Sequence, residues 1–287
     1  MKNMEKITGI IQLIRPINCI VMGVAVLVGI IVAGQTFLLD GKTTLLGFIT
    51  GFTFLAAANA VNDYYDRNID AVNEPDRPIP SGVIKPKEAL IYVFILSTIG
   101  FLTAFLTNIQ CLAIAIVAWF LSMYYAMIGK STGIFGNLIV SICVALPFIY
   151  GGFAVESGLS LILVLFAFMA FFSTIGREVT KGIVDVEGDK LQSVKTVAVL
   201  YGSRTAAVTA ALFYIVAVVI SLFPWALREV SVWYLPIVIL ADIGFIASSV
   251  FLLRDYSREN ARTVKRITRA CMATGLLAFI AGTLGGL

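Results

Sequence analysis

The sequence of 287 residues contains no histidine at all and only four cysteines. Without histidine, the chain cannot supply an imidazole base, a histidine-bound zinc ion or a Ser-His-Asp triad. Cys19, Cys111, Cys143 and Cys271 stand singly in apolar segments and form no CxxC pair. We therefore expect them to be buried packing residues rather than disulfide partners or metal ligands.

Charge is also scarce. Only 13% of the residues are charged and 59% are hydrophobic, whereas soluble domains usually carry about 25% charge. Apolar runs of about 20 residues recur along the whole chain, and each is long enough to cross a bilayer core as a helix. The alternating short strands of a membrane barrel are absent. This composition excludes an ordinary soluble domain and indicates an integral membrane protein.

The apolar runs predict an all-α polytopic membrane bundle of nine transmembrane helices. We place these helices at residues 17–37, 44–63, 89–107, 110–128, 133–154, 159–182, 205–223, 232–253 and 267–286. The first run is too long for a secretory signal and lacks a clean cleavage site, so we expect it to remain as a transmembrane helix. The whole chain, residues 1–287, is expected to form a single membrane domain.

Basic residues are divided unevenly between the two sets of connections. Nineteen of the 21 Lys and Arg residues fall at the N-terminus, in the loops after the second, fourth, sixth and eighth helices, or at the helix ends next to those loops, and only Lys42 and Arg228 fall elsewhere. The positive-inside rule therefore places the first set, with the N-terminus, in the cytoplasm. Thirteen of the 17 acidic residues lie on that same side, and most of them crowd into the loops after the second and sixth helices.

The two acidic loops share a spacing that suits a metal site. In NDYYDRNID, the residues Asn62, Asp66 and Asp70 are four apart, so on a helix they share one face. In DVEGD, Asp185 and Asp189 repeat this spacing at the end of the sixth helix. Oxygen ligands without histidine or thiolate suit Mg²⁺, which prefers a few carboxylates together with water and phosphate oxygens. We expect these clusters to bind Mg²⁺ against a diphosphate.

Basic residues stand next to both acidic clusters. Arg77 follows the first cluster, Arg177 and Lys181 precede the second, and Lys130 is the only charge in the loop after the fourth helix. Guanidinium and ammonium groups are the expected donors to phosphate oxygens. Either acidic loop alone could be a solvated cap, but the repeated DxxxD spacing on one side of the membrane favours a metal-diphosphate site.

Other polar features of the sequence lie outside the two acidic clusters. RPIPSG at 77–82 predicts a rigid turn, because its two prolines fix φ and Gly82 permits a sharp bend. The basic loop after the eighth helix is expected to contact anionic lipid, with binding of a second anionic substrate as the alternative. Asp242 stands alone in an apolar helix, where acids are functional candidates. Asp63 lies one residue off the register of the first cluster, and neither of these two acids receives a role.

The motifs resemble those of the UbiA superfamily of intramembrane prenyltransferases. NDYYDRNID is similar to the first aspartate-rich motif of that family, NDxxDxxxD, and DVEGD to the second, while RPIPSG and YYAMIGK resemble the intervening motifs. The resemblance covers almost the whole chain, from RPINC at 15–19 to the last helix. It implies nine helices around a central cavity, capped by the two aspartate loops on the cytoplasmic side of the cell membrane.

The resemblance also implies the chemistry, which is transfer of a prenyl group from a prenyl diphosphate with Mg²⁺ as cofactor. The catalytic residues at the matching positions are Asp66, Asp70, Asp185 and Asp189, and Asn62 joins them as a metal ligand. The residues implied to bind the diphosphate are Arg77, Lys130, Lys181, Arg177 and Tyr125. The opening LIRPINCIVMGVAVLVGIIVAG looks most like the branch that transfers geranylgeranyl from its diphosphate to geranylgeranylglyceryl phosphate, a lipid-like anionic acceptor.

Other activities stay open at the level of the sequence. An aromatic prenyltransferase of the 4-hydroxybenzoate or quinone type is the first alternative, because no residue here excludes a small carboxylate acceptor. CDP-alcohol phosphatidyltransferases carry a DGxxAR run that does not occur in this chain. A secondary transporter is the most distant alternative, since its polar sites are expected at the middle of the membrane. We expect membrane lipid as a partner, with no nucleic acid and no obligate protein partner.

Overall fold

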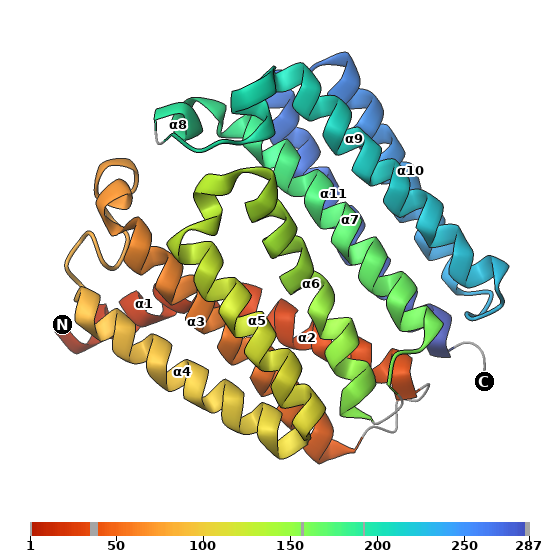
Figure 1. Cartoon of the computed structure of the whole chain (residues 1–287), viewed down its shortest axis with the longest axis horizontal. Coiled ribbons are helices and arrows are strands. Elements are labelled where there is room, and N and C mark those ends of the chain that lie inside the picture. Colours follow the sequence, from red (N-terminus) through yellow and green to blue (C-terminus); the bar gives the residue numbers. More distant parts are fainter. Residues whose placement is uncertain (1, 35–39, 156–157, 192, 285–287) are drawn as a thin grey trace. The chain divides into compact units, whose positions relative to one another are not determined.

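The computed structural model describes residues 2–34, 40–155, 158–191 and 193–284. Within these ranges the protein consists of helices and turns without a strand (Figure 1), so the prediction of an all-α fold is confirmed. The α-helices are α1 (Lys2–Ile14), α2 (Pro16–Gly34), α3 (Gly41–Asn73), α4 (Pro86–Thr107), α5 (Ile109–Met127), α6 (Ile134–Ala154), α7 (Leu161–Val184), α8 (Val186–Leu191), α9 (Val197–Ala226), α10 (Tyr234–Arg254) and α11 (Arg258–Leu284). A short 3₁₀ helix, η1 (Gly129–Thr132), precedes α6.

Eight helices in the described part of the chain are long and apolar enough to cross a membrane. They are α2, α3, α4, α5, α6, α7, α9 and α10. These match the first eight predicted spans, and the chain is a multi-pass membrane protein. The ninth predicted span, 267–286, lies in α11 as far as Leu284, and residues 35–37 of the first span and 285–286 of the ninth lie outside the described residues. The count of nine spans and the cytoplasmic N-terminus stay predictions.

The second predicted span ends later than the sequence suggested. It was expected to end at residue 63, but α3 continues to Asn73, where the N–H of Glu74 donates to Asp70 O at 2.8 Å. The loss of apolar residues marks where side chains leave the membrane, whereas the backbone stays helical as long as its own hydrogen bonds continue. The segment NDYYDRNID is therefore helical throughout.

Three other helices, α9, α11 and α1, also differ from the predictions. α11 was expected to begin at residue 267 but begins at Arg258, so most of the predicted basic loop after the eighth span is helical. α9 was expected to begin at residue 205, but it begins at Val197, after the hydroxyl of Thr196 accepts from the N–H of Val199 at 3.3 Å, an N-cap arrangement. A kink at Gly202, with φ 83°, separates its first turn from the rest. α1 was not predicted at all, because it is too short and too polar to be read as a span. It is joined to α2 through Arg15, whose φ is 53°.

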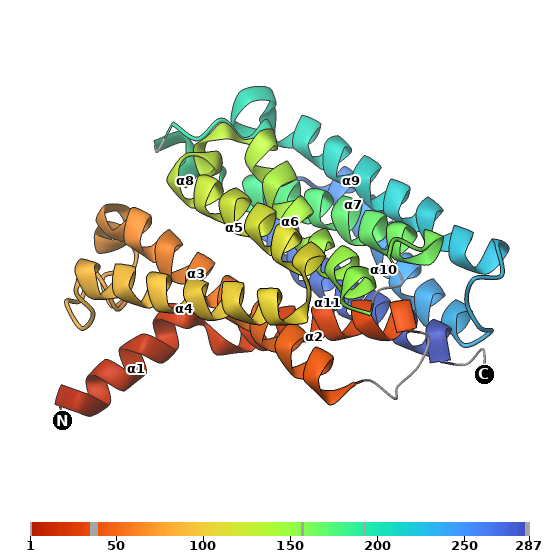
Figure 2. The ribbon, with the colours of Figure 1, turned by 60° about the horizontal axis from the view of Figure 1, so that its bottom comes forward.

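The chain forms two compact units, each described by itself. The first comprises α1, the first part of α2, and α3, α4 and α5. In this unit α3 and α4 run side by side (Figure 2), and Leu13 of α1 shares an apolar core with Ile84 of the α3–α4 connection. This connection is the structured turn that the sequence predicted, since Gly82 has φ 78° and the N–H of Ile84 donates to Pro78 O at 2.8 Å.

The second unit comprises the end of α2, η1 and α6 to α11. Its helix α7 packs against α6, α9 and α11. α2 and α6 meet so closely that a Cβ on Gly151 would lie 2.2 Å from the carbonyl carbon of Gly29, so glycine is required at this crossing. All four cysteines of the chain are free and three are buried, as predicted, while Cys143 is half-buried.

Candidate active site

The first acidic cluster occupies the C-terminal part of α3. Asn62, Asp66 and Asp70 all lie on this continuous helix, as predicted. Asp70 is buried, and the other two side chains are half-buried. Because residues four apart on a helix lie above one another, their amide and carboxylate oxygens follow one side of α3.

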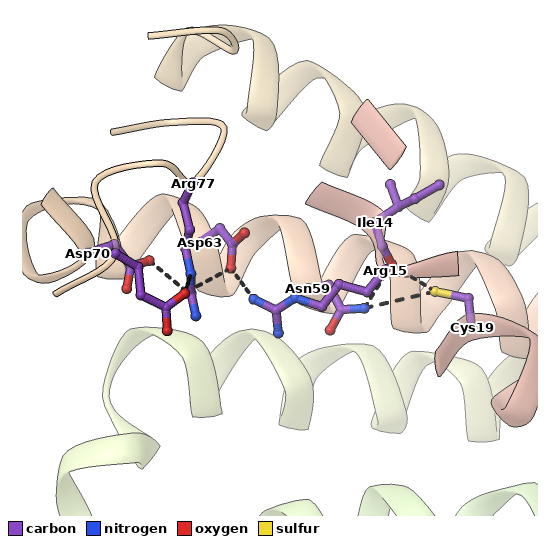
Figure 3. Close-up of polar contacts among 8 residues, drawn as sticks. Ile14, Arg15, Cys19, Asn59, Asp63, Asp70 and Arg77 are labelled. Atoms are coloured by element: carbon purple, nitrogen blue, oxygen red, sulfur yellow. Dashed lines mark hydrogen bonds and ion pairs between the residues drawn. The ribbon is translucent and has the colours of Figure 1, made fainter. Parts of the chain in front are cut away.

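Arg77 lies against the end of this cluster (Figure 3). Its Nη1 donates to Asp70 Oδ2 at 2.8 Å and its Nε donates to Glu74 Oε2 at 2.6 Å. The turn that follows α3 holds it there, with the N–H of Ser81 donating to Arg77 O at 2.9 Å. The structure thus brings a predicted metal ligand and a predicted diphosphate-binding residue together as an ion pair.

The second acidic cluster lies at a break between two helices. α7 ends at Val184 and Asp185 caps it, as expected for the end of the sixth span. Asp189 lies instead on the short helix α8, because the backbone of Asp185 departs from the helix at φ −101° and ψ 7°. The N–H of Asp189 donates to Asp185 O at 2.9 Å, which keeps the two acids one turn apart across the break.

Charges of both signs surround the Asp189 carboxyl. Burial raises the pKa of Asp189 to about 6, and the nearby Asp185 carboxylate acts in the same direction. Lys181 and Lys130 oppose this rise in pKa, as does a hydrogen bond with Thr196. The structure therefore gathers four predicted site residues around one point of the second unit, with Lys130 contributed by η1 and Lys181 by α7.

Arg177 and Lys181 share an acid that sequence reasoning left without a role. Arg177 Nη2 donates to Glu178 Oε1 at 2.6 Å, and Lys181 Nζ lies 3.8 Å from Glu178 Oε2. Glu178 is buried, and a buried carboxylate is costly unless cations pair with it. Its position between two basic residues in REVTK was the signal that could have revealed it. Tyr125 lies half-buried on α5, which belongs to the first unit.

Two further residues beside the first cluster were also left without a role. Asp63 is almost fully buried, and its Oδ1 lies 2.5 Å from Nη2 of Arg15 (Figure 3). An extra acid inside the motif and an arginine directly before the first span were the available signals. Neither signal says that two residues so far apart in the chain would meet.

Asp242 lies in the middle of α10. Its Oδ2 accepts from Ser221 Oγ at 2.7 Å, and the Tyr234 hydroxyl donates to Ser221 O at 2.8 Å. These bonds join α9 and α10 in the buried part of the second unit. Asp242 therefore has a structural explanation, as a polar contact between two membrane helices.

The donor atoms of both clusters suit a magnesium ion. They are carboxylate and amide oxygens, the hard ligands that Mg²⁺ prefers. Within the described residues, no three Asp, Glu, Cys or His side chains converge into a complete site. Mg²⁺ sites in proteins usually provide only a few protein ligands, because water and phosphate oxygens complete the coordination. The residues present therefore fit this ion.

A family model described as the UbiA prenyltransferase family matches residues 22–282. The chain belongs to this family. Its UbiA relatives include the digeranylgeranylglyceryl phosphate synthase of Methanosphaera stadtmanae, which is 33% identical over 96% of this chain and 98% of the relative. The synthase of the same name from Pyrococcus furiosus is 33% identical over 97% of this chain and 98% of its own length.

Solved structures support the same UbiA fold. A structure reported for digeranylgeranylglyceryl phosphate synthase in membranes superposes with a TM-score of 0.84 and 32% identity, covering 98% of this chain and 99% of that one. A UbiA homolog from Archaeoglobus fulgidus, bound to GPP and Mg²⁺, gives a TM-score of 0.70 at 18% identity over 95% of this chain and 99% of its own. The family resemblance seen in the motifs is confirmed.

Proposed function

We propose that this UbiA-family protein transfers a geranylgeranyl group from geranylgeranyl diphosphate to geranylgeranylglyceryl phosphate, forming the second ether bond of archaeal membrane lipids. The observation that carries this proposal is the identity of 33% with synthases of that name over at least 96% of the chain. Related UbiA structures bound to GPP or DMAPP together with Mg²⁺ support the donor class and the cofactor. An identity of this kind, spread over full-length chains, favours the same acceptor as well.

The acids of the two clusters are the proposed metal-binding residues. They are Asn62, Asp66, Asp70, Asp185 and Asp189. When bound, Mg²⁺ supplies neutralisation of the charge that develops on the departing diphosphate. The four aspartates act as catalytic residues because they would hold this ion at the leaving group. Their hard oxygen donors and the absence of histidine from the sequence support this assignment.

Basic side chains are proposed to bind the diphosphate oxygens. Arg77, Lys130 and Lys181 are the main candidates, and Arg177 and Tyr125 are further candidates. Arg77 already contacts Asp70, and the two lysines act on Asp189, so each cation is located next to an acid assigned to the metal. Charge-assisted hydrogen bonds from guanidinium and ammonium groups are the strong ones for phosphate.

The reaction needs little acid–base chemistry from the protein. The allylic C–O bond breaks, the diphosphate leaves with the electron pair, and the acceptor hydroxyl oxygen forms the new bond to the same carbon. The hydroxyl proton leaves with the released diphosphate, which explains why no histidine base is required. Apolar helices exclude water, which would otherwise capture the allylic cation.

We further propose that the protein lies in the cell membrane with its acidic clusters facing the cytoplasm, as a single prenyltransferase domain. The excess of Lys and Arg on that side supports the orientation. The continuous family match over residues 22–282 supports the single domain. Membrane lipid and the two lipid substrates are the proposed partners, and no obligate protein partner is proposed.

The deciding experiment is an acceptor assay with purified protein and radiolabelled geranylgeranyl diphosphate. We expect labelled product with geranylgeranylglyceryl phosphate in the presence of Mg²⁺, and none after chelation by EDTA. Parallel reactions contain 4-hydroxybenzoate or a naphthoate. Product from the aromatic acid alone would replace this proposal with the aromatic prenyltransferase.

A further inference from the structure

Asp63 is a buried carboxylate that the proposed metal site does not use. It follows Asn62 on α3, one residue off the register of the metal-binding side chains, and is 3% exposed. A carboxylate buried to this extent is costly unless it is paired. Its Oδ1 has two partners, at 2.5 Å from Nη2 of Arg15 and 3.5 Å from Nη1 of Arg77 (Figure 3).

Arg77 is shared between two acids with different roles. Its Nη1 lies 2.8 Å from Asp70 Oδ2, a proposed metal ligand, and 3.5 Å from Asp63 Oδ1. A guanidinium and a divalent cation compete for one carboxylate, because each neutralises the same charge. When Asp70 binds the metal, Arg77 loses its shortest buried contact. Diphosphate oxygens offer the replacement acceptors, since Arg suits their geometry.

Asp63 also pairs with Arg15, which is not one of the proposed metal-binding or diphosphate-binding residues. Arg15 adopts φ 53° between α1 and α2, a conformation that is uncommon for a residue other than glycine. The carbonyl of Ile14 just before it accepts from Asn59 Nδ2 of α3 at 2.9 Å. Asn59 and Asp63 are four residues apart on α3 and hold this junction together. Arg15 thereby gives Asp63 a fixed positive partner, wherever the Arg77 side chain points.

The third acid at Arg77 is a weaker partner than Asp63. Glu74 Oε2 accepts from Arg77 Nε at 2.6 Å, but the Glu74 side chain is 59% exposed. Exposed ion pairs contribute little, because water screens the two charges. Of the three acids at Arg77, which are Asp63, Asp70 and Glu74, Asp63 is therefore the buried one that stays available after Asp70 binds the metal.

We propose that Arg77 is an exchangeable counter-ion of Asp70 and that Asp63 is the positioning residue that retains it. In the metal-free protein, Arg77 neutralises Asp70. When the site takes up metal and diphosphate, the guanidinium moves from Asp70 to the diphosphate oxygens while Asp63 keeps it at the end of α3. This inference rests on the proposed function, because it assigns Asp70 to the metal and Arg77 to the diphosphate.

A magnesium titration without any prenyl substrate tests the exchange. Thermal unfolding of the full-length protein in detergent is followed against Mg²⁺ concentration for the wild type and for Arg77→Met. Because Arg77 competes for Asp70, we expect the variant to reach half-maximal stabilisation at about threefold to tenfold less Mg²⁺. An unchanged or higher midpoint overturns the exchange.

Arg67→Met is the matched control for this titration. Arg67 lies on α3, before the turn that carries Arg77, and its guanidinium lies 4.5 Å over the Tyr64 ring, with Nη1 donating to Tyr64 O at 2.6 Å. Its partner is thus an aromatic residue and a carbonyl rather than a proposed metal ligand. We expect its Mg²⁺ midpoint to stay within about twofold of the wild type. A fall equal to that of Arg77→Met would mean that any lost positive charge suffices, and would overturn the specific exchange.

Steady-state kinetics test the positioning role of Asp63. At saturating Mg²⁺, Asp63→Asn should raise the KM for geranylgeranyl diphosphate by about tenfold, with kcat within about threefold. Glu74→Gln removes the exposed partner of Arg77 and should change KM by less than about twofold. In an Arg77→Met background, Asp63→Asn should add no further rise in KM. An equal rise in both backgrounds overturns the proposal, because Asp63 would then act without Arg77.

The two tests fail in different ways. If Asp63→Asn does not fold, the titration of Arg77→Met still decides whether the exchange occurs. If the wild type transfers no geranylgeranyl group, the proposed function fails, but the titration contains no prenyl substrate and retains its meaning. If the wild type is active but Arg77→Met has the same Mg²⁺ midpoint as the wild type, the exchange is contradicted and the proposed function is not.

Discussion

The two acidic clusters share one spacing but are held in different ways. In the first, α3 is a continuous helix through Asn62, Asp66 and Asp70, and Arg77 pairs with the last of these at 2.8 Å. In the second, the helix breaks at the first acid, Asp185, which caps α7, and Asp189 has its pKa raised to about 6 by burial and by the neighbouring carboxylate. The same DxxxD pattern therefore produces two electrostatic environments.

The difference predicts that the two clusters contribute differently to metal binding. Arg77 partly neutralises the first cluster, so under the proposed assignment a cation that binds Asp70 has to displace this arginine. The second keeps two acids close together, and mutual repulsion between like charges is relieved by a divalent cation. We expect the second cluster to attract the metal more strongly and the first to couple metal binding to the capture of diphosphate.

The largest effect is expected from removing one acid in each cluster. Asp66→Ala and Asp185→Ala should each lower turnover by on the order of 10³-fold, because a proposed ligand to the charge-neutralising ion is lost. Formation of labelled lipid product measures this rate. Gel filtration and thermal unfolding in detergent show whether each variant stays folded. Near-normal rates in both variants would refute the metal assignment, and a loss in one alone would confine the chemistry to that cluster.

Smaller effects are expected from replacing the two cations near the second cluster, and these effects should differ between Lys181 and Arg177. Lys181→Met should raise the KM for geranylgeranyl diphosphate by about tenfold, because Lys181 lies near Asp189 and its Nζ is 3.8 Å from Glu178 Oε2. Arg177→Met should change KM by less than about threefold and mainly lower stability, since its guanidinium is held by buried Glu178 at 2.6 Å. KM and unfolding temperature are measured for both. A reversal of the two effects on KM would make Arg177 the diphosphate-binding residue.

Much of the fold could be predicted because its signals are local. Each apolar run is long enough to specify a span, and eight predicted spans coincide with helices in the described residues. The i, i+4 spacing of Asn62, Asp66 and Asp70 was enough to place them on one helix. The end of α3 was misplaced because the sequence shows where apolarity stops, and hydrogen bonding at Glu74 decides where the helix stops.

The contacts that tune the site are not local and could not be predicted. Asp63 meets Arg15 across 48 positions of sequence, and no periodicity links the two. Lys130 of η1 acts electrostatically on Asp189 of α8, and the break at Asp185 depends on a backbone angle that DVEGD does not specify. Residue type and spacing therefore predicted a metal-diphosphate site, and the resemblance to the UbiA motifs predicted prenyl transfer, while the pairing of the charges required the three-dimensional structure.

The smallest expected effects are shifts in unfolding temperature without Mg²⁺, and they should have opposite signs in the two clusters. Asp189→Asn should raise the unfolding temperature by about 2–4 °C, because it removes a carboxylate that burial and Asp185 disfavour. Asp70→Asn should lower it by a similar amount, because Arg77 loses its shortest buried partner. Shifts of the same sign in both variants would contradict the difference between the clusters.

The pH dependence of the unfolding temperature is a second test of the stabilisation expected for Asp189→Asn. The pKa of Asp189 is raised in the folded protein from an ordinary 3.8 to about 6, so the folded state binds the proton more tightly than the unfolded state does. Stability contributed by this group therefore rises as pH falls through 6 and is lost above it. The advantage of Asp189→Asn should be largest above pH 6 and should shrink toward pH 4. Unfolding temperatures of the wild type and the variant, measured across this range without Mg²⁺, should converge at the acidic end, and curves that stay parallel would show that burial of the charge is not what Asp189→Asn relieves.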